Sequence, residues 1–393
     1  MNFRTVICTL FLAAFATVPS NLSAAEEPIN VNRSFGTKII PISLSGYTGE
    51  AAGVLRFDLE VAGFEITTDD KAQYALSGKN EGGQVEGRLQ DKLSKATLLA
   101  KAYTGDNTRA QSHALADDVV LAILKIPGIA RTKIVFKQQL QATGNGEIYI
   151  SDYDGQNAKA VTTDNTIVAA PVWVPKHWHI FYTSYKSSYP WIYTHDLTTG
   201  ERRPFARFPG LNSSASISPD GTKVAMILSK GGSPDLWVSN IDGNGLTQLT
   251  KTATDESSPC WSPDGSKVCF ASRTEERRGL FVIPSTGGDM RRLNTGGEPN
   301  PSEPDWSPDG KSIVFTSQSR AGFAICVMSS QGGDVQPPLA EGEDPSWAPN
   351  SRTVIFTRRV GSKRVLSLLD VPTKRVKDTV QISGSRSQPN WAK

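Results

Sequence analysis

Short segments of alternating apolar and polar residues follow one another from residue 132 to the end of the chain, separated by turns that contain Gly or Asp. Alternation with a period of two places the apolar side chains on one face of a β-strand. The segments are also rich in aromatic and β-branched residues, which favour strands. The pattern predicts that residues 132–393 form a domain built from many short strands.

The tetrapeptide Ser-Pro-Asp-Gly recurs at 218–221, 262–265 and 307–310, and weaker versions occupy 174–177 and 348–351. It fits a type I turn, because Pro pre-sets φ at the second position and Ser, Asp and Gly suit the others. A Gly with positive φ can then lead into a second strand. Each copy therefore predicts a strand, a tight turn and another strand.

The residue before each turn recurs at nearly constant intervals of 44, 44, 45, 41 and 44 residues. These residues are Trp173, Ile217, Trp261, Trp306, Trp347 and Trp391. Another apolar segment, such as LWVSNIDGNG or LFVIPSTGG, follows each turn. A period of about 40–45 residues with four short strands is typical of a β-propeller blade.

The repeat is incomplete at its two ends in complementary ways. The segment IYISDYDG at 148–155 has no Trp-turn element before it, and Trp391 stands in a final strand with no turn after it. Together the final strand and residues 132–168 complete one unit, which gives six units. We predict a six-bladed β-propeller closed by pairing of the C-terminal strand with the 132–168 segment. An open β-solenoid, the alternative, would not predict complementary half-units.

Residues 26–131 lack the repeat. Their apolar periodicity predicts strands at 38–44, 64–67, 74–78, 84–89 and 96–103, and a helix at 50–62. Asn107 is a suitable N-cap for a second helix that ends before Pro127 and Gly128. We predict an α+β domain with a mixed sheet, preceded by a mobile polar segment at 26–37.

The N-terminus has the pattern of an export signal: Arg4, an apolar stretch over 5–18, and the small residues Ser23-Ala24-Ala25. The apolar stretch is too short to span a bilayer. We predict cleavage after Ala25. The predicted organisation is a signal peptide (1–25), an α+β domain (26–131) and an all-β propeller (132–393).

Charge and cysteine content narrow the function classes. A net charge of +3 argues against a nucleic-acid partner, which would require a strong basic field. Cys260 and Cys269 flank one turn symmetrically, so a hairpin would place them opposite each other. We favour two small apolar core residues, and a disulfide is the alternative in an oxidising compartment.

The segment HALADDVVLAILKIPGIARTKIVF at 113–136 joins the α+β domain to the first propeller strand. With the export signal and the WSPDG-type units, it resembles the TolB family, the periplasmic component of the Tol–Pal system of Gram-negative envelopes. The matching residues are His113, Ala116, Asp117, Gly128, Ile129, Thr132, Lys133 and Ile134. The segment 208–243 also looks like the family's second blade.

The resemblance implies a periplasmic binding protein without catalysis and without a cofactor. In the family, the peptidoglycan-associated lipoprotein Pal binds at one mouth of the propeller, and the N-terminal segment engages TolA of the inner membrane. The resemblance thus implies a role in outer-membrane integrity and in constriction at cell division. It also implies a monomer that reaches the envelope through its partners, with no membrane span in the mature chain.

The expected contact surface lies on the loops that precede the Trp strands, because six such loops surround one mouth of the ring. Family contact positions match Leu211 and Ser214 in the second loop and Ser257 and Ser258 in the third. In well-studied members the position of Leu211 can be a His and that of Ser258 an acid. The other expected partner-binding residues are Asn212, Ser213, Asn300, Glu303, Glu343, Asp344 and Arg386.

Two further expectations concern these loops. For each expected contact residue, the alternative is a solvated loop residue without a partner. Acidic residues near the tunnel mouth could also hold a cation such as Ca²⁺ through oxygen ligands.

An enzyme remains the alternative function. His177, His179 and His195 fall in one blade, where a sugar-lyase-like propeller could place a metal. A prolyl-oligopeptidase would require a hydrolase domain with a Gly-x-Ser-x-Gly motif, which the sequence lacks. A propeller that binds a glycan or another protein is a second alternative.

Overall fold

The structure is a computed structural model that describes residues 39–140, 144–274 and 277–393. These residues form a small α+β domain with a five-stranded mixed sheet, followed by six four-stranded antiparallel sheets. The predicted fold class is confirmed. The predicted signal peptide and the segment 26–37 lie outside the described residues. Within the described part of the chain, no helix is both long enough and apolar enough to cross a membrane.

The α+β domain contains a sheet in the order β2-β1-β3-β4-β5, in which β1 is parallel to β2 and β3 and the other pairs are antiparallel. Its elements are β1 (Ile40–Ser45), α1 (Gly49–Val61), β2 (Phe64–Ile66), a 3₁₀ turn (Asp69–Lys71), β3 (Tyr74–Glu81), β4 (Gln84–Asp91), β5 (Thr97–Tyr103) and α2 (Thr108–Leu124).

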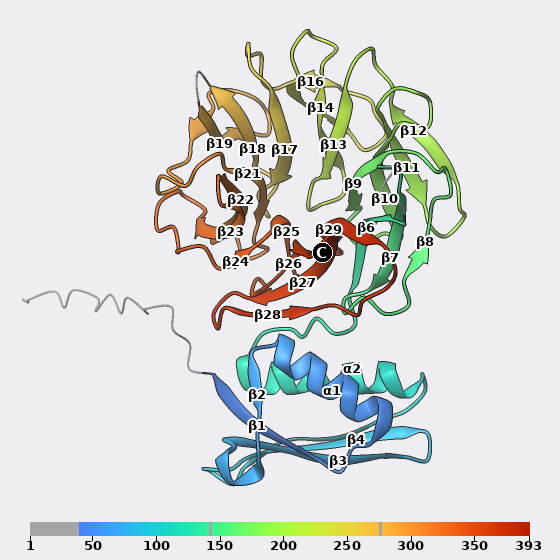
Figure 1. Ribbon diagram of the computed structural model, residues 1–393, viewed down its shortest axis with the longest axis vertical. Coiled ribbons are helices and arrows are strands. Elements are labelled where there is room, and N and C mark those ends of the chain that lie inside the picture. Colours follow the sequence, from blue (N-terminus) through green and yellow to red (C-terminus); the bar gives the residue numbers. More distant parts are fainter. Residues whose placement is uncertain (1–38, 141–143, 275–276) are drawn as a thin grey trace, which may run out of the picture. The chain divides into compact units, whose positions relative to one another are not determined.

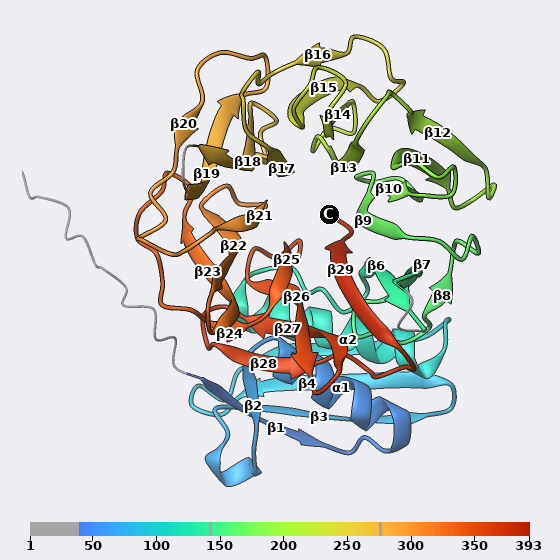
Figure 2. The ribbon, with the colours of Figure 1, turned by 45° about the horizontal axis from the view of Figure 1, so that its top comes forward.

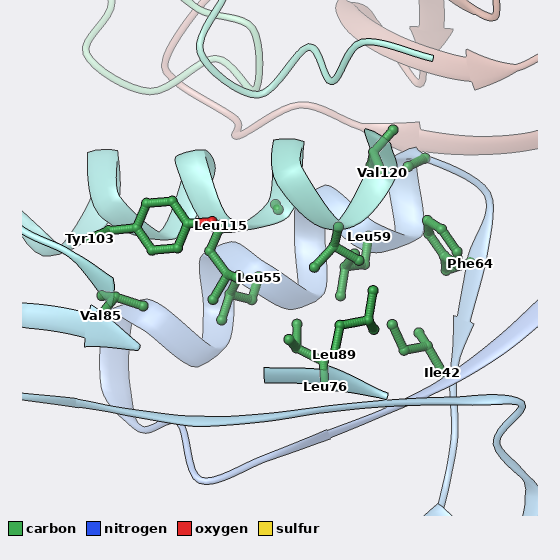
Figure 3. Packing of buried hydrophobic residues seen from close by; sticks show 13 residues of the cluster. Ile42, Leu55, Leu59, Phe64, Leu76, Val85, Leu89, Tyr103, Leu115 and Val120 are labelled. Carbon is green, nitrogen blue, oxygen red and sulfur yellow. The ribbon is translucent and has the colours of Figure 1, made fainter. Parts of the chain in front are cut away.

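The two helices pack on the same face of this sheet, and their apolar side chains form one core with the strands (Figure 3). Leu55 and Leu59 of α1 and Leu115 of α2 have no exposed surface. The Asn107 side chain accepts the N–H of Ala110 at 2.9 Å, which caps α2 as predicted.

The junction motif has a structural explanation. Asp117 on α2 accepts the N–H of Ala130 at 2.8 Å and pairs with Arg131, so its carboxylate fixes the chain after the helix. A Cβ at position 128 would lie 2.1 Å from Asp117 Oδ1, which explains the Gly at this position. His113 Nδ1 lies 2.7 Å from the buried Asp58 carboxylate, which also accepts the Tyr153 hydroxyl.

Each propeller sheet has four strands, ordered from the centre outwards. The first complete blade contains β9 (Val168–Trp173), β10 (His179–Ser184), β11 (Trp191–Asp196) and β12 (Arg202–Ala206), and the second contains β13 (Asn212–Ile217), β14 (Lys223–Leu228), β15 (Asp235–Asn240) and β16 (Thr247–Gln248). The third contains β17 (Glu256–Trp261), β18 (Lys267–Thr274), β19 (Arg277–Pro284) and β20 (Arg291–Arg292), and the fourth contains β21 (Ser302–Trp306), β22 (Ser312–Ser319), β23 (Gly322–Ser329) and β24 (Ala340–Glu341). The fifth contains β25 (Glu343–Trp347), β26 (Thr353–Val360), β27 (Lys363–Asp370) and β28 (Arg375–Asp378).

The repeated turn joins the two innermost strands of a blade, as predicted. In the second complete blade, Gly221 donates its N–H to the Ser218 carbonyl at 2.8 Å and has a φ of 73°. Asp220 Oδ1 accepts the N–H of Thr222 at 3.0 Å, which holds the turn closed. The turn is therefore a locally satisfied scaffold element.

The sixth blade contains both ends of the propeller domain, in the order β29 (Ser385–Trp391), β6 (Lys133–Gln139), β7 (Glu147–Asp152) and β8 (Lys159–Ala160). Figures 1 and 2 show β29 completing the ring beside β6. The two strands are antiparallel, with Trp391 opposite Ile134. The Trp391 indole donates to Thr132 Oγ1 at 2.7 Å, and its ring stacks on Tyr153. The predicted closure is confirmed.

Replacing Trp391 with Ala should lower the free energy of unfolding by about 3–5 kcal/mol, because the change leaves a cavity at the closure and removes a buried hydrogen bond. Trp178 is 43% exposed and provides the control. Its replacement by Ala should cost less than about 1 kcal/mol. Urea unfolding of both variants measures the difference, and equal losses would show that the closure does not depend on Trp391.

Candidate functional site

Six residues, one from each innermost strand, surround one end of the propeller tunnel. Each has a φ between 47° and 56°, in the left-handed region that non-glycine residues seldom adopt. Each lies where the pairing with the next strand shifts register, so every innermost strand carries a bulge. We call this set the throat ring: Ala170, Ser214, Ser258, Glu303, Asp344 and Gln388.

The throat ring lines a cavity of about 200 Å³ together with the residues that follow it in each strand. Five of its six members precede a proline, which limits the conformations of the bulge and removes a backbone donor. Backbone strain of this kind, repeated six times, is typical of a functional surface rather than of a scaffold. The observation makes the throat ring the candidate binding site.

Hydrogen bonds connect neighbouring blades along part of the throat ring. Glu303 Oε2 accepts the N–H of Asp344 at 2.8 Å. Asp344 Oδ2 accepts the N–H of Gln388 at 3.1 Å, and Gln388 Oε1 accepts the N–H of Ala170 at 3.1 Å. In one half of the ring, the side chains of Glu303, Asp344 and Gln388 therefore link neighbouring blades. The other half carries the small side chains of Ala170, Ser214 and Ser258.

Asp344 has an unusual protonation equilibrium. Burial raises the pKa of its carboxyl group to about 8, and the nearby charges of Glu303 and Glu343 act in the same direction. The hydroxyl of Thr357 donates to Asp344 Oδ2 at 3.0 Å, and this hydrogen bond opposes the shift. Burial and the neighbouring carboxylates therefore favour the neutral form of this carboxyl group.

The structure brings four of the residues expected to contact a partner into the throat ring: Ser214, Ser258, Glu303 and Asp344. Ser213, Ser257 and Glu343 precede three of them in the same strands and are half-buried. Glu343 pairs with Arg364 at 2.9 Å. Leu211 is half-buried beside the second bulge, and Asn300 is exposed in the loop before β21. Their role in partner binding stays a prediction.

Asn212 and Arg386 lie in strands rather than on an exposed loop, so the placement expected for them was wrong, while their role in partner binding stays a prediction. Asn212 has no exposed surface; its side chain accepts the Phe208 N–H at 2.8 Å and donates to the Phe208 carbonyl, so it braces the loop from below. Arg386 is 1% exposed, and burial lowers the pKa of its guanidinium to about 10. The reason is that β13 and β29 begin before their bulges, so both residues are already part of a strand.

Glu256, which no sequence pattern singles out, organises the third loop. It is buried at the start of β17 and accepts the hydroxyls of Thr250, Thr252 and Ser272 at 3.1, 2.8 and 3.0 Å. Burial raises the pKa of Glu256 to about 7. Glu256 immediately precedes Ser257 and Ser258, so it holds the loop that carries them. Its position among polar loop residues gave no signal of burial.

The alternative metal site is not supported by the geometry. His177 lies in the exposed turn after β9, whereas His195 is buried in β11. Burial lowers the pKa of His179 and of His195. Across residues 39–140, 144–274 and 277–393, no group of three or more His, Cys, Asp or Glu side chains is arranged to hold a metal. A Ca²⁺ ion in the tunnel stays a prediction, and the described residues contain no such group of ligands for it.

Cys260 and Cys269 lie directly opposite each other in β17 and β18, as the hairpin predicts. Both are free, buried thiols in the core between two blades. Burial raises the pKa of Cys260 well above its usual range. They are packing residues, which agrees with the favoured interpretation rather than with the disulfide.

Comparison with known proteins gives consistent matches. Residues 122–393 match the family model described as TolB beta propeller domain. A Tol-Pal system protein TolB of Anaeromyxobacter dehalogenans strain 2CP-C is 30% identical over 296 residues, which cover 64% of this chain and 67% of that protein. The protein of the same name from Anaeromyxobacter sp. strain K is 30% identical over 293 residues, covering 64% of this chain and 67% of the relative.

Among solved structures, the crystal structure of TolB from Acinetobacter baumannii covers 90% of this chain and 97% of its own chain, with a TM-score of 0.80 and 22% identity. A chain of a nidogen/laminin complex covers 66% of this chain and 98% of its own, with a TM-score of 0.55 and 13% identity. At these identities the structural matches show the fold alone.

Replacing Asp344 with Asn should stabilise the protein at high pH. A raised pKa in the folded state means that the neutral acid favours folding at low pH, and this contribution is lost as the pH rises from about 4 to about 8. Asn is neutral throughout and can accept the same hydrogen bonds. The variant should therefore match the parent protein near pH 4 and exceed its stability at pH 9 by on the order of a few kcal/mol.

Thermal unfolding at both pH values measures this effect. Asp255 is exposed on the same face, and Asp255→Asn is the control for loss of one negative charge. The control should show no comparable gain at pH 9. If Asp344→Asn were less stable than the parent protein at pH 9, Asp344 would be an ordinary ionised carboxylate.

Proposed function

Because the chain belongs to the TolB family, we propose that it acts as the TolB component of a Tol–Pal system in the periplasm and binds the lipoprotein Pal at the throat ring. The single observation that carries this proposal is the convergence of six strained bulges on one mouth of the propeller. A ring of this kind offers backbone and side-chain polar groups to a partner that presents a protruding loop.

The two ends of the tunnel differ in a way that favours the throat end. The opposite mouth is lined by prolines of the repeated turns, Pro219, Pro263 and Pro308, and by tryptophan and charged side chains. Its carboxylate, Asp305, is already paired with Lys393 at 2.6 Å. Those turns satisfy their own polar groups, as Asp220 does for Thr222. The throat end carries the side-chain variety that recognition requires, with two carboxyl groups, one amide and three small residues.

The proposal extends to the remaining partner and to the cellular role. The segment 26–37 engages TolA of the inner membrane, and Pal connects the propeller to the outer membrane and to peptidoglycan. The protein then supports outer-membrane integrity and constriction during division as a binding protein without catalysis. The family membership supports these roles.

Replacing Ser258 with Arg should weaken binding of the soluble domain of Pal at least about tenfold, because a long charged side chain would fill the throat. The control is Ser266→Arg, which places the same side chain in the exposed turn at the other end of the same blade. It should bind as the parent protein does.

Isothermal titration calorimetry of both variants, each checked for an unchanged melting temperature, provides the measurement. Equal weakening by both substitutions, or by neither, would exclude the throat as the Pal site. Absence of saturable binding to the parent protein would overturn the assignment of Pal as partner.

A further inference from the structure

Hydrogen bonds between neighbouring blades divide the tunnel wall into two unlike sides. On one side, the backbone N–H of each throat-ring residue donates to the side chain of the ring residue in the preceding blade. The donors are Asp344, Gln388 and Ala170 in the fifth, sixth and first blades, at 2.8, 3.1 and 3.1 Å from their acceptors. In the part of the chain that the structure describes, no side chain accepts the N–H of Ser214, Ser258 or Glu303 in the second, third and fourth blades.

The same division recurs one level deeper in the tunnel, two residues after each ring residue. Here Asp305, Ser346 and Asn390 accept the backbone N–H groups of Trp347, Trp391 and Trp173 at 2.7, 3.2 and 3.0 Å, again in the fifth, sixth and first blades. The matching positions for the second, third and fourth blades hold Val172, Ser216 and Cys260. Within the described ranges, none of these three side chains accepts a backbone N–H. The division is therefore a property of one side of the tunnel.

The backbone is alike on both sides, so the side chains make the difference. All six ring residues have a φ between 47° and 56°, and all six innermost strands, which surround the tunnel in Figure 2, shift register at this point. This common geometry directs the N–H groups of the second, third and fourth blades toward the preceding blade as well. The side chains of Ala170, Ser214 and Ser258 are too short to accept them there.

We call the side without these acceptors the donor wall. It consists of the following backbone N–H groups, three at the throat ring and three at the deeper level: Ser214, Ser258, Glu303, Ile217, Trp261 and Trp306. The ring residues and the residues of the deeper level line one cavity of about 200 Å³. A backbone N–H removed from water costs free energy unless an oxygen atom accepts it. The linked side shows which oxygen atoms suit these places, because its acceptors belong to carboxyl, amide and hydroxyl groups.

The oxygen atoms of a ligand on the donor wall should be neutral. Glu303 and Asp344 already place two carboxyl groups on the ring, and the charges of Glu303 and Glu343 act on Asp344. Another carboxylate would add like-charge repulsion, whereas a carbonyl oxygen accepts the same hydrogen bonds without it. Ser214 and Ser258 line the same side, and their hydroxyl groups can donate to such an oxygen. Aliphatic and cationic groups would leave the N–H groups without an acceptor.

We propose that the donor wall binds neutral carbonyl oxygens, from Asn or Gln side chains and from main-chain peptide groups, on a partner loop that enters the throat. The inference rests on the proposed function for the identity of the partner. It adds that docking is one-sided, because the loop lies against the second, third and fourth blades. The side chains of Glu303, Asp344 and Gln388 meanwhile keep their hydrogen bonds to neighbouring blades.

Ala170→Gln tests the donor wall by supplying an acceptor from within the chain. It copies at position 170 the arrangement in which Gln388 accepts the N–H of the next ring residue. Ala170→Met is the control, because it has a similar length and no strong acceptor. The Gln variant should melt about 1–2 °C above the Met variant and should bind the soluble Pal domain roughly tenfold more weakly than the Met variant does. Equal melting and equal binding of the two variants would overturn the proposal.

Gln388→Met tests the physical premise on the linked side. The substitution removes the oxygen that accepts the N–H of Ala170 and keeps the length of the side chain. This variant should melt about 1–2 °C below the parent protein. An unchanged melting temperature would show that acceptors between blades do not stabilise the ring, and the case for the donor wall would then fail.

Residue-resolved amide exchange, followed by NMR, reads the N–H groups themselves. In the free protein, the amides of Ser214, Ser258 and Glu303 should exchange faster than their counterparts on the linked side, and the Pal domain should slow them. Equally slow exchange at all six ring amides of the free protein would show that acceptors are already present. Binding of the Pal domain without slower exchange at Ser214, Ser258 and Glu303 would show that the partner does not use the donor wall. Either result overturns the proposal.

A small probe separates this inference from the proposed function. Acetamide, a neutral amide, should shift the NMR amide signals of Ser214, Ser258 and Glu303 in the parent protein, and the signal of Ser214 should no longer shift in Ala170→Gln. If the Pal domain fails to bind while acetamide produces these shifts, the proposed partner is wrong and the donor wall stands as a site for carbonyl oxygens. If acetamide shifts none of the three signals, the donor wall is not such a site, whether or not the Pal domain binds.

Discussion

The pairing of β29 with β6 is the interaction on which the rest of the structure depends. It joins residues 385–391 to residues 134–139, so a single antiparallel pair holds the two ends of the propeller domain together. The innermost strand of the sixth blade then supplies Gln388, whose N–H is accepted by Asp344 and whose side chain accepts the N–H of Ala170. Without this strand the throat ring would lose one member and the links on both sides of it.

The two ends of each blade have opposite physical characters. At the turn end, Ser-Pro-Asp-Gly satisfies its own donors and acceptors with low strain, and Gly supplies the one positive φ that the turn needs. At the throat end, six non-glycine residues hold a positive φ, a conformation that costs about 1–3 kcal/mol each. The rigid repeat stabilises these strained positions. The residues of the repeated turns therefore serve as scaffold, whereas the residues of the throat ring, which do not repeat, form the candidate site.

The repeat, the turn chemistry and the ring closure were all visible in the sequence, because each is a local pattern or a spacing. The errors concern long-range arrangement. Asn212 and Arg386 occupy polar segments that look like loops, yet the innermost strands extend through them and both side chains are buried. A bulge breaks the period of two, so the alternation stops being visible where the site begins. The closeness of Glu303 and Asp344, which raises the pKa of Asp344, depends on neighbouring blades and has no sequence signature.

The account places recognition at the throat face and scaffold at the turn face. Hydrogen–deuterium exchange of the protein with and without the soluble Pal domain tests this division directly. The account predicts protection at 210–214, 254–258, 298–303, 341–344 and 384–388, and no change at the turns 218–221, 262–265 and 307–310. Protection confined to those turns, or to the α+β domain, would contradict it.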